Sequence, residues 1–261
     1  MNLSNELILE VKSLAKYIRI QSLVMISRAG SSHIGSCLSV AEITATLHIK
    51  TKQTEDVIIF SKGHAAAAMY ASLAGIGVIS QDRLAEFGKD GSELIGHINH
   101  KIDGVLFSTG SLGHGMPIGI GVSIASKSKH VFVIISDGEL NEGTTWESLA
   151  IAKQLKLGNL TVIIDANGIQ SFGHTNMVLN LEPLVDKFKS FGWNTLEVDG
   201  HSIPQLLKSL NKNLVDTPKI IIARTTKGKG LKIMENKLEW HYKSPGKIDL
   251  DKYIEEVENN A

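Results

Sequence analysis

Two polar residues follow apolar runs at positions that suit cation chemistry. Asp137 comes just after the run VFVII (131–135), and Asn167 follows a second run, 160–164. If both runs are parallel strands, their carboxyl ends lie at one edge of a sheet, where such sheets bind ligands. Gly138 lets the backbone approach a phosphate closely, while a carboxylate and an amide oxygen suit a hard cation. The sequence therefore predicts a site for Mg²⁺ or Ca²⁺ bridged to a diphosphate.

An isolated Asp-Gly pair has a second interpretation, because this pair is common in ordinary turns. The combination with Asn167 favours the cation site. A dinucleotide site is disfavoured, since no strand is followed directly by G-x-G-x-x-G and a downstream acid.

The elements that must position these residues follow from the hydrophobic pattern. The pattern predicts helices over 6–28, 40–50, 65–74, 144–157 and around 203–210, and strands over 57–60, 131–135, 160–164, 195–198 and 219–223. Ser39 and Glu42 form a candidate capping box for the second helix. The strand–helix–strand order predicts an α/β fold with a mostly parallel central sheet and helices on both faces. The tail, 247–261, is expected to be a surface helix or a frayed end.

Composition excludes several classes of protein. With 27 Lys and Arg against 27 Asp and Glu, the chain has no basic excess for binding nucleic acid. Its single cysteine, Cys37, forms no intrachain disulfide, and the amino-terminal segment lacks the apolar core of a signal peptide. No run reaches about 18 apolar residues, so we expect no membrane span and a cytoplasmic protein.

The chain resembles the transketolase family over roughly 10–247. The motif SDGELNEG with Asn167 is similar to the thiamine diphosphate motif that begins Gly-Asp-Gly. Further similar segments occur in order: SSHIGSCLSVAEI (31–43), IFSKGHAAAAMYASLAGIGVI (59–79), GVLFSTGSLGHGMPIGIGVSIA (104–125), FKSFGWNTLEVDGHS (188–202) and ARTTKGKGLKIMENKLEWHYKSPG (223–246). The resemblance implies a thiamine diphosphate-binding fold, with 1–261 forming a single domain that binds the diphosphate.

The resemblance also assigns the ligands of the cofactor and its metal. It implies that Asp137 and Asn167 bind Mg²⁺ through their side chains and Ile169 through its carbonyl, with Ca²⁺ or Mn²⁺ as substitutes. Other cofactor contacts would come from Gly138, Asn167, His64, His241, Gly110, Ser111 and Leu112. The glycines that follow, Gly119 and Gly121, have an alternative role in close helix packing.

Four histidines match active-site positions of the family: His33, His64, His97 and His241. The resemblance implies that His64 approaches the diphosphate and reaction centre and His97 the terminal hydroxyl of a ketose donor. His33 and His241 would face the hydroxyl that exchanges a proton. An imidazole suits this role because its ordinary pKa, about 6.5, lets it give and take protons near neutral pH. Each one alone is more often a structural histidine. His97 and His100 have a zinc-like spacing, but no further ligand accompanies them.

The family's activating glutamate lies in a pyrimidine-binding domain that this sequence does not include. We therefore expect a split enzyme, in which a separate C-terminal subunit supplies that domain and an α2β2 assembly acts on small sugar substrates. The reaction implied is transfer of a two-carbon ketol unit from a ketose, or its phosphate, to an aldose, with the cofactor carrying the carbanion chemistry.

Three residues depart from the family pattern; the first is a small-for-small change that should still permit the turn, and the other two bear on substrate contacts. Ser136 replaces the first glycine of the motif, His114 stands where glutamine is common, and Ile98 replaces a common proline. Two alternatives remain. One is a subunit that decarboxylates a 2-oxo acid and transfers the acyl unit in specialised metabolism, and the other is a non-catalytic regulatory subunit.

Overall fold

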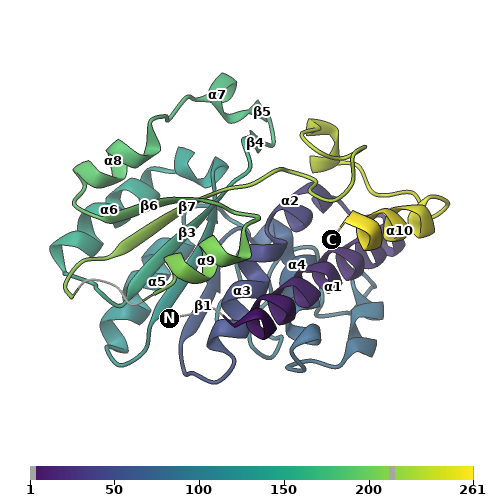
Figure 1. The fold of residues 1–261 in the computed structure, drawn as a ribbon, viewed down its shortest axis with the longest axis horizontal. Helices are drawn as coiled ribbons and strands as arrows, with labels where there is room; N and C mark the ends of the chain where they lie inside the picture. The colour runs from purple at the N-terminus through teal and green to yellow at the C-terminus, as the bar shows by residue number, and fades with distance from the viewer. Residues whose placement is uncertain (1–3, 212–214, 261) are drawn as a thin grey trace.

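The computed structural model describes residues 4–211 and 215–260, and a five-stranded parallel sheet forms its centre (Figure 1). The strand order is β1-β2-β3-β7-β6. The strands are β1 (Val57–Phe60), β2 (Val131–Ser136), β3 (Leu160–Ala166), β6 (Asn194–Asp199) and β7 (Lys219–Arg224). Ser136 pairs with Asp165, and Asp165 pairs with Ala223, so three neighbouring strands end at one edge. The predicted parallel sheet is confirmed.

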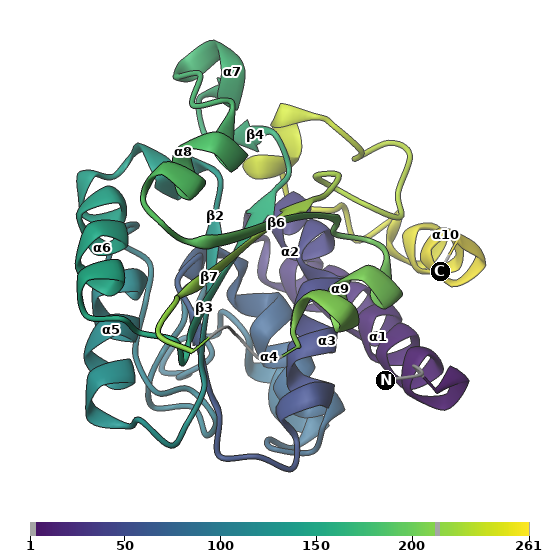
Figure 2. The same ribbon diagram turned by 60° about the vertical axis from the view of Figure 1, so that its left-hand side comes forward.

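Helices cover both faces of this sheet (Figure 2). One face carries α1 (Asn5–Ala29), α2 (Ile34–Ser39), α3 (Ala41–Thr51), α4 (Ala66–Gly75) and α9 (Ile203–Ser209), with α10 (Leu250–Asn260) against α1. The other face carries α5 (Gly115–Ala125), α6 (Gly143–Gln154) and α8 (Leu184–Ser190). Strand side chains alternate between the two layers: Phe132 and Ile134 pack in the first core, and Val131, Val133 and Ile135 in the second.

Shorter elements lie mainly around the strand ends. They are the hairpin of β4 (Ile169–Gln170) and β5 (Gly173–His174), the helix α7 (Thr175–Val178), and the 3₁₀ turns η1 (Gly63–Ala65), η2 (Gln81–Glu86), η3 (Gly138–Asn141) and η4 (Leu238–His241). In the carboxyl-terminal tail, the helical alternative is confirmed by α10, while residue 261 lies outside the described residues. Across the two described ranges, no helix is both long and apolar enough to cross a membrane.

Ser39 does not cap the helix that follows it. It is the last residue of α2, and α3 begins after Val40 without a side-chain cap. The Ser39 hydroxyl instead donates to Oδ2 of buried Asp165 at 2.6 Å, and Glu42 pairs with Arg19. The capping-box prediction is therefore wrong, because a buried carboxylate distant in sequence takes the hydroxyl.

Two glycines of α5, Gly119 and Gly121, have different roles. A Cβ on Gly119 would lie 2.5 Å from Cγ2 of Val133, so glycine permits this helix to pack closely on β2. A Cβ on Gly121 would meet nothing within 4 Å. The close-packing interpretation is confirmed for Gly119 and is wrong for Gly121.

Candidate active site

The loops after β2 and β3 are joined by the carboxylate of Asp137. Its Oδ1 accepts a hydrogen bond from the N–H of Gly138 at 2.8 Å, and its Oδ2 accepts one from the N–H of Gly168 at 2.6 Å. Asn167 follows β3, and its Oδ1 accepts from the N–H of Ile169 at 3.1 Å. The sheet edge thus brings Asp137, Asn167 and Ile169 together along one cavity.

This oxygen donor set fits a hard cation. Asp137 is buried, and burial together with the charge of Asp165 raises the pKa of its carboxyl above the ordinary value. A cation beside Asp137 would offset the free-energy cost of keeping its buried carboxylate charged. Carboxylate, amide and carbonyl oxygens are also ligands that Mg²⁺ accepts. The described residues hold no group of three or more His, Cys, Asp or Glu arranged for a metal. The Nδ1 of His100 lies 2.7 Å from the Ser108 hydroxyl.

The four predicted histidines converge on the same cavity from distant parts of the chain. The ring centre of His33 lies 5.3 Å from that of His64, 6.0 Å from that of His97 and 4.9 Å from that of His241. His33 holds this position with a left-handed backbone, φ 72°, and its N–H donates to the carbonyl of His241 at 3.0 Å. The cavity, of about 210 Å³, is therefore lined both by these imidazoles and by Asp137, Asn167 and Ile169.

Burial changes the protonation expected for these rings. Desolvation lowers the pKa of His33 to about 4 and that of His241 to about 3, and it holds the pKa of His64 well below 6.5. The positive charges of Lys62 and Lys227 act in the same direction. In this chain the three rings are thus neutral at pH 7, not poised near 6.5 as expected from an ordinary histidine. Neutral imidazoles can accept hydrogen bonds and protons.

Two buried lysines belong to this edge and were not among the predicted residues. Lys62 is fully buried and pairs with Asp165, which also accepts from Ser39 and Thr225. Lys227 lines the cavity, and its Nζ donates to the Ile169 carbonyl at 2.9 Å. Both lysines follow strand ends, after β1 and β7, but a lysine at such a position does not by itself indicate a site.

The segment 110–115 is held in place by a buried carboxylate. Oε1 of Glu139 accepts from the N–H of Gly113 at 2.8 Å and from the Ser61 hydroxyl. Gly110 and Leu112 line the cavity. Ser111, which was predicted with them, is exposed and is not among the residues that line it.

Tight backbone packing and additional polar side chains shape the rest of the cavity. A Cβ on Gly110 would lie 2.9 Å from Cδ2 of His97, and one on Gly138 would lie 3.0 Å from Cβ of Gln170. Gln170 itself lines the cavity, together with Ser36 and Ser171, none of which was predicted. The backbone of Gly138 therefore approaches the cavity with little room for a side chain.

Known proteins with this sequence pattern are transketolases and their subunits. A family model described as transketolase, thiamine diphosphate binding domain, matches residues 10–256. One subunit of the apulose-4-phosphate transketolase of Actinobacillus succinogenes is 35% identical, over 96% of each chain. The SqwG subunit of the 6-deoxy-6-sulfo-D-fructose transketolase of a Clostridium species is 32% identical, over 89% of this chain and 90% of that protein.

Longer transketolases are similar over part of their length. The human enzyme is 34% identical over 95% of this chain and 42% of its own length. The structure of transketolase from Leishmania mexicana superimposes with a TM-score of 0.87 and 27% identity, over 95% of this chain and 41% of that one. The chain thus spans about two fifths of these enzymes. It belongs to the transketolase family, as a thiamine diphosphate-binding domain.

Proposed function

We propose that this chain is the thiamine diphosphate- and Mg²⁺-dependent subunit of a two-chain transketolase. The enzyme transfers a two-carbon ketol unit from a ketose, or ketose phosphate, to an aldose. The convergence of four imidazoles and three oxygen donors on one cavity, in a chain of this family, is the observation that supports this most strongly. Thiamine diphosphate, when bound, supplies the carbon nucleophile and the electron sink for carbon–carbon cleavage.

The metal and diphosphate ligands are assigned to the edge formed by β2 and β3. Asp137, Asn167 and the Ile169 carbonyl hold the cation, with Ca²⁺ or Mn²⁺ as substitutes for Mg²⁺. The N–H of Gly138, together with Gly110 and Leu112, holds the cofactor. The ammonium of Lys227, which already contacts the Ile169 carbonyl, adds positive charge where a diphosphate needs it.

The imidazoles bind and orient the sugar and move its protons. His97 contacts the terminal hydroxyl of the donor, and His64 lies beside the reacting carbon. His33 and His241 face the hydroxyl that becomes a carbonyl. His33, neutral before substrate binds, accepts and returns its proton, whereas His241, whose Nδ1 lies 2.8 Å from the Lys227 ammonium, donates a hydrogen bond to it from Nε2. The neutral state suits the accepting step, because a charged imidazolium has no free lone pair on either nitrogen.

A separate C-terminal subunit supplies the pyrimidine-binding domain and the activating glutamate in this proposal, and the working unit is α2β2. Two relatives of nearly the same length are themselves named as single subunits of a transketolase, which supports this division. We also assign the enzyme to the cytoplasm, where the thiol of buried Cys37 stays reduced.

Reconstitution with the partner tests the reaction. The chain is mixed with the product of a candidate gene that encodes pyrimidine-binding and C-terminal domains, together with thiamine diphosphate and Mg²⁺. Ketose-dependent lengthening of an aldose by two carbons is expected, and it should be lost when either chain is omitted. Release of CO₂ from pyruvate without ketol transfer would instead support the 2-oxo acid alternative.

A further inference from the structure

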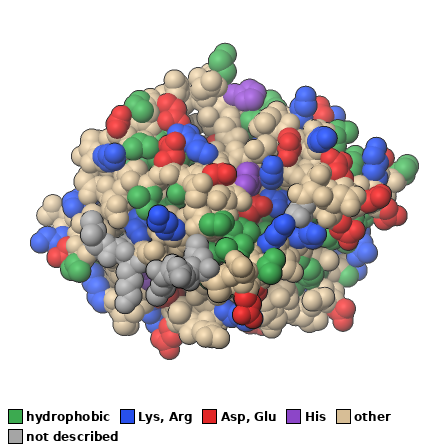
Figure 3. Space-filling view, in the orientation of Figure 1, with side chains coloured by type: hydrophobic (Ala, Val, Ile, Leu, Met, Phe, Trp, Pro, Cys, Tyr) green, Lys and Arg blue, Asp and Glu red, His purple; other side chains and the backbone are tan. Residues whose placement is uncertain are grey.

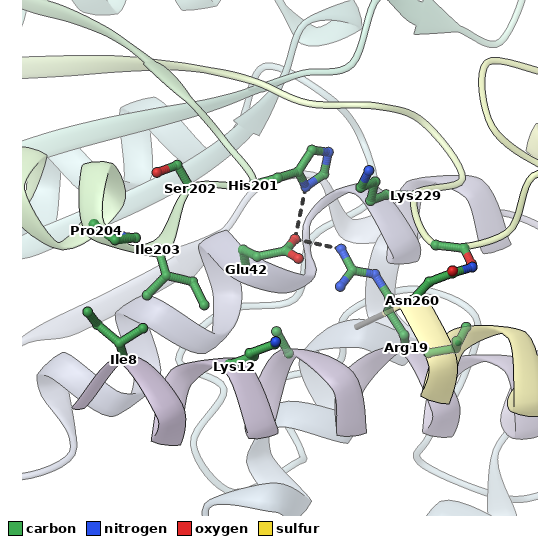
Figure 4. Close-up of a pocket in the computed structure, with 13 residues that line it drawn as sticks. Ile8, Lys12, Arg19, Glu42, His201, Ser202, Ile203, Pro204, Lys229 and Asn260 are labelled. Atoms are coloured by element: carbon green, nitrogen blue, oxygen red, sulfur yellow. Dashed lines mark hydrogen bonds and ion pairs between the residues drawn. The ribbon is translucent and has the colours of Figure 1, made fainter. Parts of the chain in front are cut away.

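A second cavity, of about 360 Å³, lies between α1, α3 and the loop that joins β6 to α9 (Figure 4). It shares no lining residue with the candidate active site. Its apolar wall comes from α1, α9 and α10 and consists of Ile8, Ala15, Ile203, Pro204 and Val257. Near the middle of the face in Figure 3, hydrophobic and basic side chains lie next to one another.

The polar wall of this cavity has an excess of positive charge. Lys12, Arg19 and Lys229 line it, and Glu42 is the single carboxylate among the described lining residues. In Figure 4, Lys12 and Lys229 lie on either side of the Arg19 guanidinium. An anion entering the cavity would therefore meet three cations and one anion.

The carboxylate of Glu42 already forms contacts within the protein, with Arg19 and His201. Its Oε2 accepts from Nη2 of Arg19 at 2.6 Å and lies 3.0 Å from Nδ1 of His201. Nε2 of His201 accepts from the N–H of Thr226 at 2.8 Å, so Nδ1 carries the ring proton and donates it to Glu42. Burial alone would raise the pKa of Glu42, but Arg19 and His201 lower it to about 2. Glu42 is therefore ionised and offers little to a cationic ligand.

The basic side chains, in contrast, have hydrogen-bond donors that are available to a ligand. Arg19 is 5% exposed, its two hydrogen bonds both start from Nη2, and its Nε has no partner. Within 4–211 and 215–260, Lys12 forms no ion pair. Lys229 has only a distant pair with Glu235, at 3.7 Å. A buried guanidinium with unused donors, flanked by two available ammonium groups, is a setting that favours an anionic ligand.

We propose that this cavity binds a small organic anion with an apolar body. The charged end lies among Lys12, Arg19 and Lys229, and the body lies against the wall formed by α1, α9 and α10. This site is independent of the proposed catalytic function, because none of its residues contributes to the strand-end cavity.

Calorimetric titration of the 261-residue chain with octanoate tests the proposal, with octylammonium as a probe of the same body and opposite charge. We expect saturable binding of octanoate at one site, and octylammonium binding at least tenfold weaker. Lys12→Ala and Lys229→Ala should each weaken octanoate binding by roughly threefold to tenfold, as expected for loss of a charge-assisted contact. Both side chains lie at the surface, so these changes should leave folding intact.

Lys89→Ala is the matched control, since it removes one exposed positive charge that is not part of the cavity lining. It should leave octanoate affinity unchanged. The proposal is overturned if octanoate shows no saturable binding, if octylammonium binds as tightly, or if the Lys12 and Lys229 variants retain the affinity of the unmodified chain.

Discussion

Nζ of Lys227 donates a hydrogen bond to Nδ1 of His241 at 2.8 Å. Because Nδ1 accepts, the neutral ring carries its proton on Nε2. The same ammonium holds the Ile169 carbonyl, so one buried lysine connects the histidine side of the cavity with the proposed metal side. This relationship fixes the tautomer of His241 and makes its ring a hydrogen-bond donor in the cavity.

Lys227→Met should raise the pKa of His241. Desolvation is the largest cause of its low value, about 3, and the charge of Lys227 is the next. Removing that charge makes the imidazolium less unfavourable, while burial still keeps the pKa below 6.5. Titration of the histidine ring signals by NMR measures the change. Lys243→Met, which removes an exposed charge near the same histidine, should have little effect; an unchanged His241 pKa in Lys227→Met would contradict the pairing.

Stability should fall in acid, in part through His48. This ring is buried on α3, its Nδ1 lies 2.9 Å from the Ser72 hydroxyl, and burial lowers its pKa to about 4. The unfolded chain, with a pKa of about 6.5, binds more protons below that pH, so stability is lost as pH falls from 6.5 through 4.

Substitution of the ring isolates this effect. Lowering the pH from 7.5 to 5 should reduce the free energy of unfolding of both proteins. The reduction should be roughly 2 kcal/mol smaller in His48→Asn than in the unmodified chain. Urea unfolding at the two pH values measures the difference. The exposed His174, changed to Asn, should keep the original pH dependence. If His48→Asn also keeps it, His48 is not buried as a neutral ring.

Asp137→Asn should remove most metal-dependent affinity for thiamine diphosphate. The change keeps the size of the side chain but removes the charge, and one of the two bonds to Gly138 and Gly168 loses its acceptor. We expect affinity to fall by about 100-fold or more, in line with the ~3 kcal/mol of strong charge-assisted contacts. Calorimetry with Mg²⁺ on the reconstituted complex measures it, with circular dichroism as the test of folding. Retained affinity would overturn the metal assignment.

A pair of glycine substitutions tests the packing of α5. Gly119→Ala places a Cβ against Val133 and should destabilise the fold by about 1–3 kcal/mol. Gly121→Ala, on the same helix, meets open space and should be neutral or stabilise by up to about 1 kcal/mol. Denaturant unfolding compares the two. Equal effects would mean that α5 does not approach β2 as closely as described.

The sheet and its edge were predictable because they depend on local patterns. Apolar runs followed by Asp137 and Asn167 predict parallel strands and a ligand site at their ends. The strands are parallel, and a cavity lies at their carboxyl ends. Lys62 and Lys227 obey the same rule, but a lone lysine after a strand carries no distinguishing signal until its buried partners are known.

Contacts between distant segments were not predictable from pattern alone. The bond from Ser39 to Asp165 displaced a local cap, and the close approach of His33 to His64 and His241 depends on packing of three separate loops. The pairing of Arg19, Glu42 and His201 joins α1, α3 and the loop before α9, and none of the three positions suggests the others in sequence.

Anomalous diffraction from Mn²⁺, in crystals of the reconstituted complex with thiamine diphosphate, tests most directly whether this sheet edge is the cofactor site. We predict one peak about 2.1 Å from oxygens of Asp137, Asn167 and the Ile169 carbonyl, close to the Mg²⁺ distance, with the diphosphate beside Gly138. A metal peak elsewhere, or a diphosphate bound away from these residues, would contradict the account.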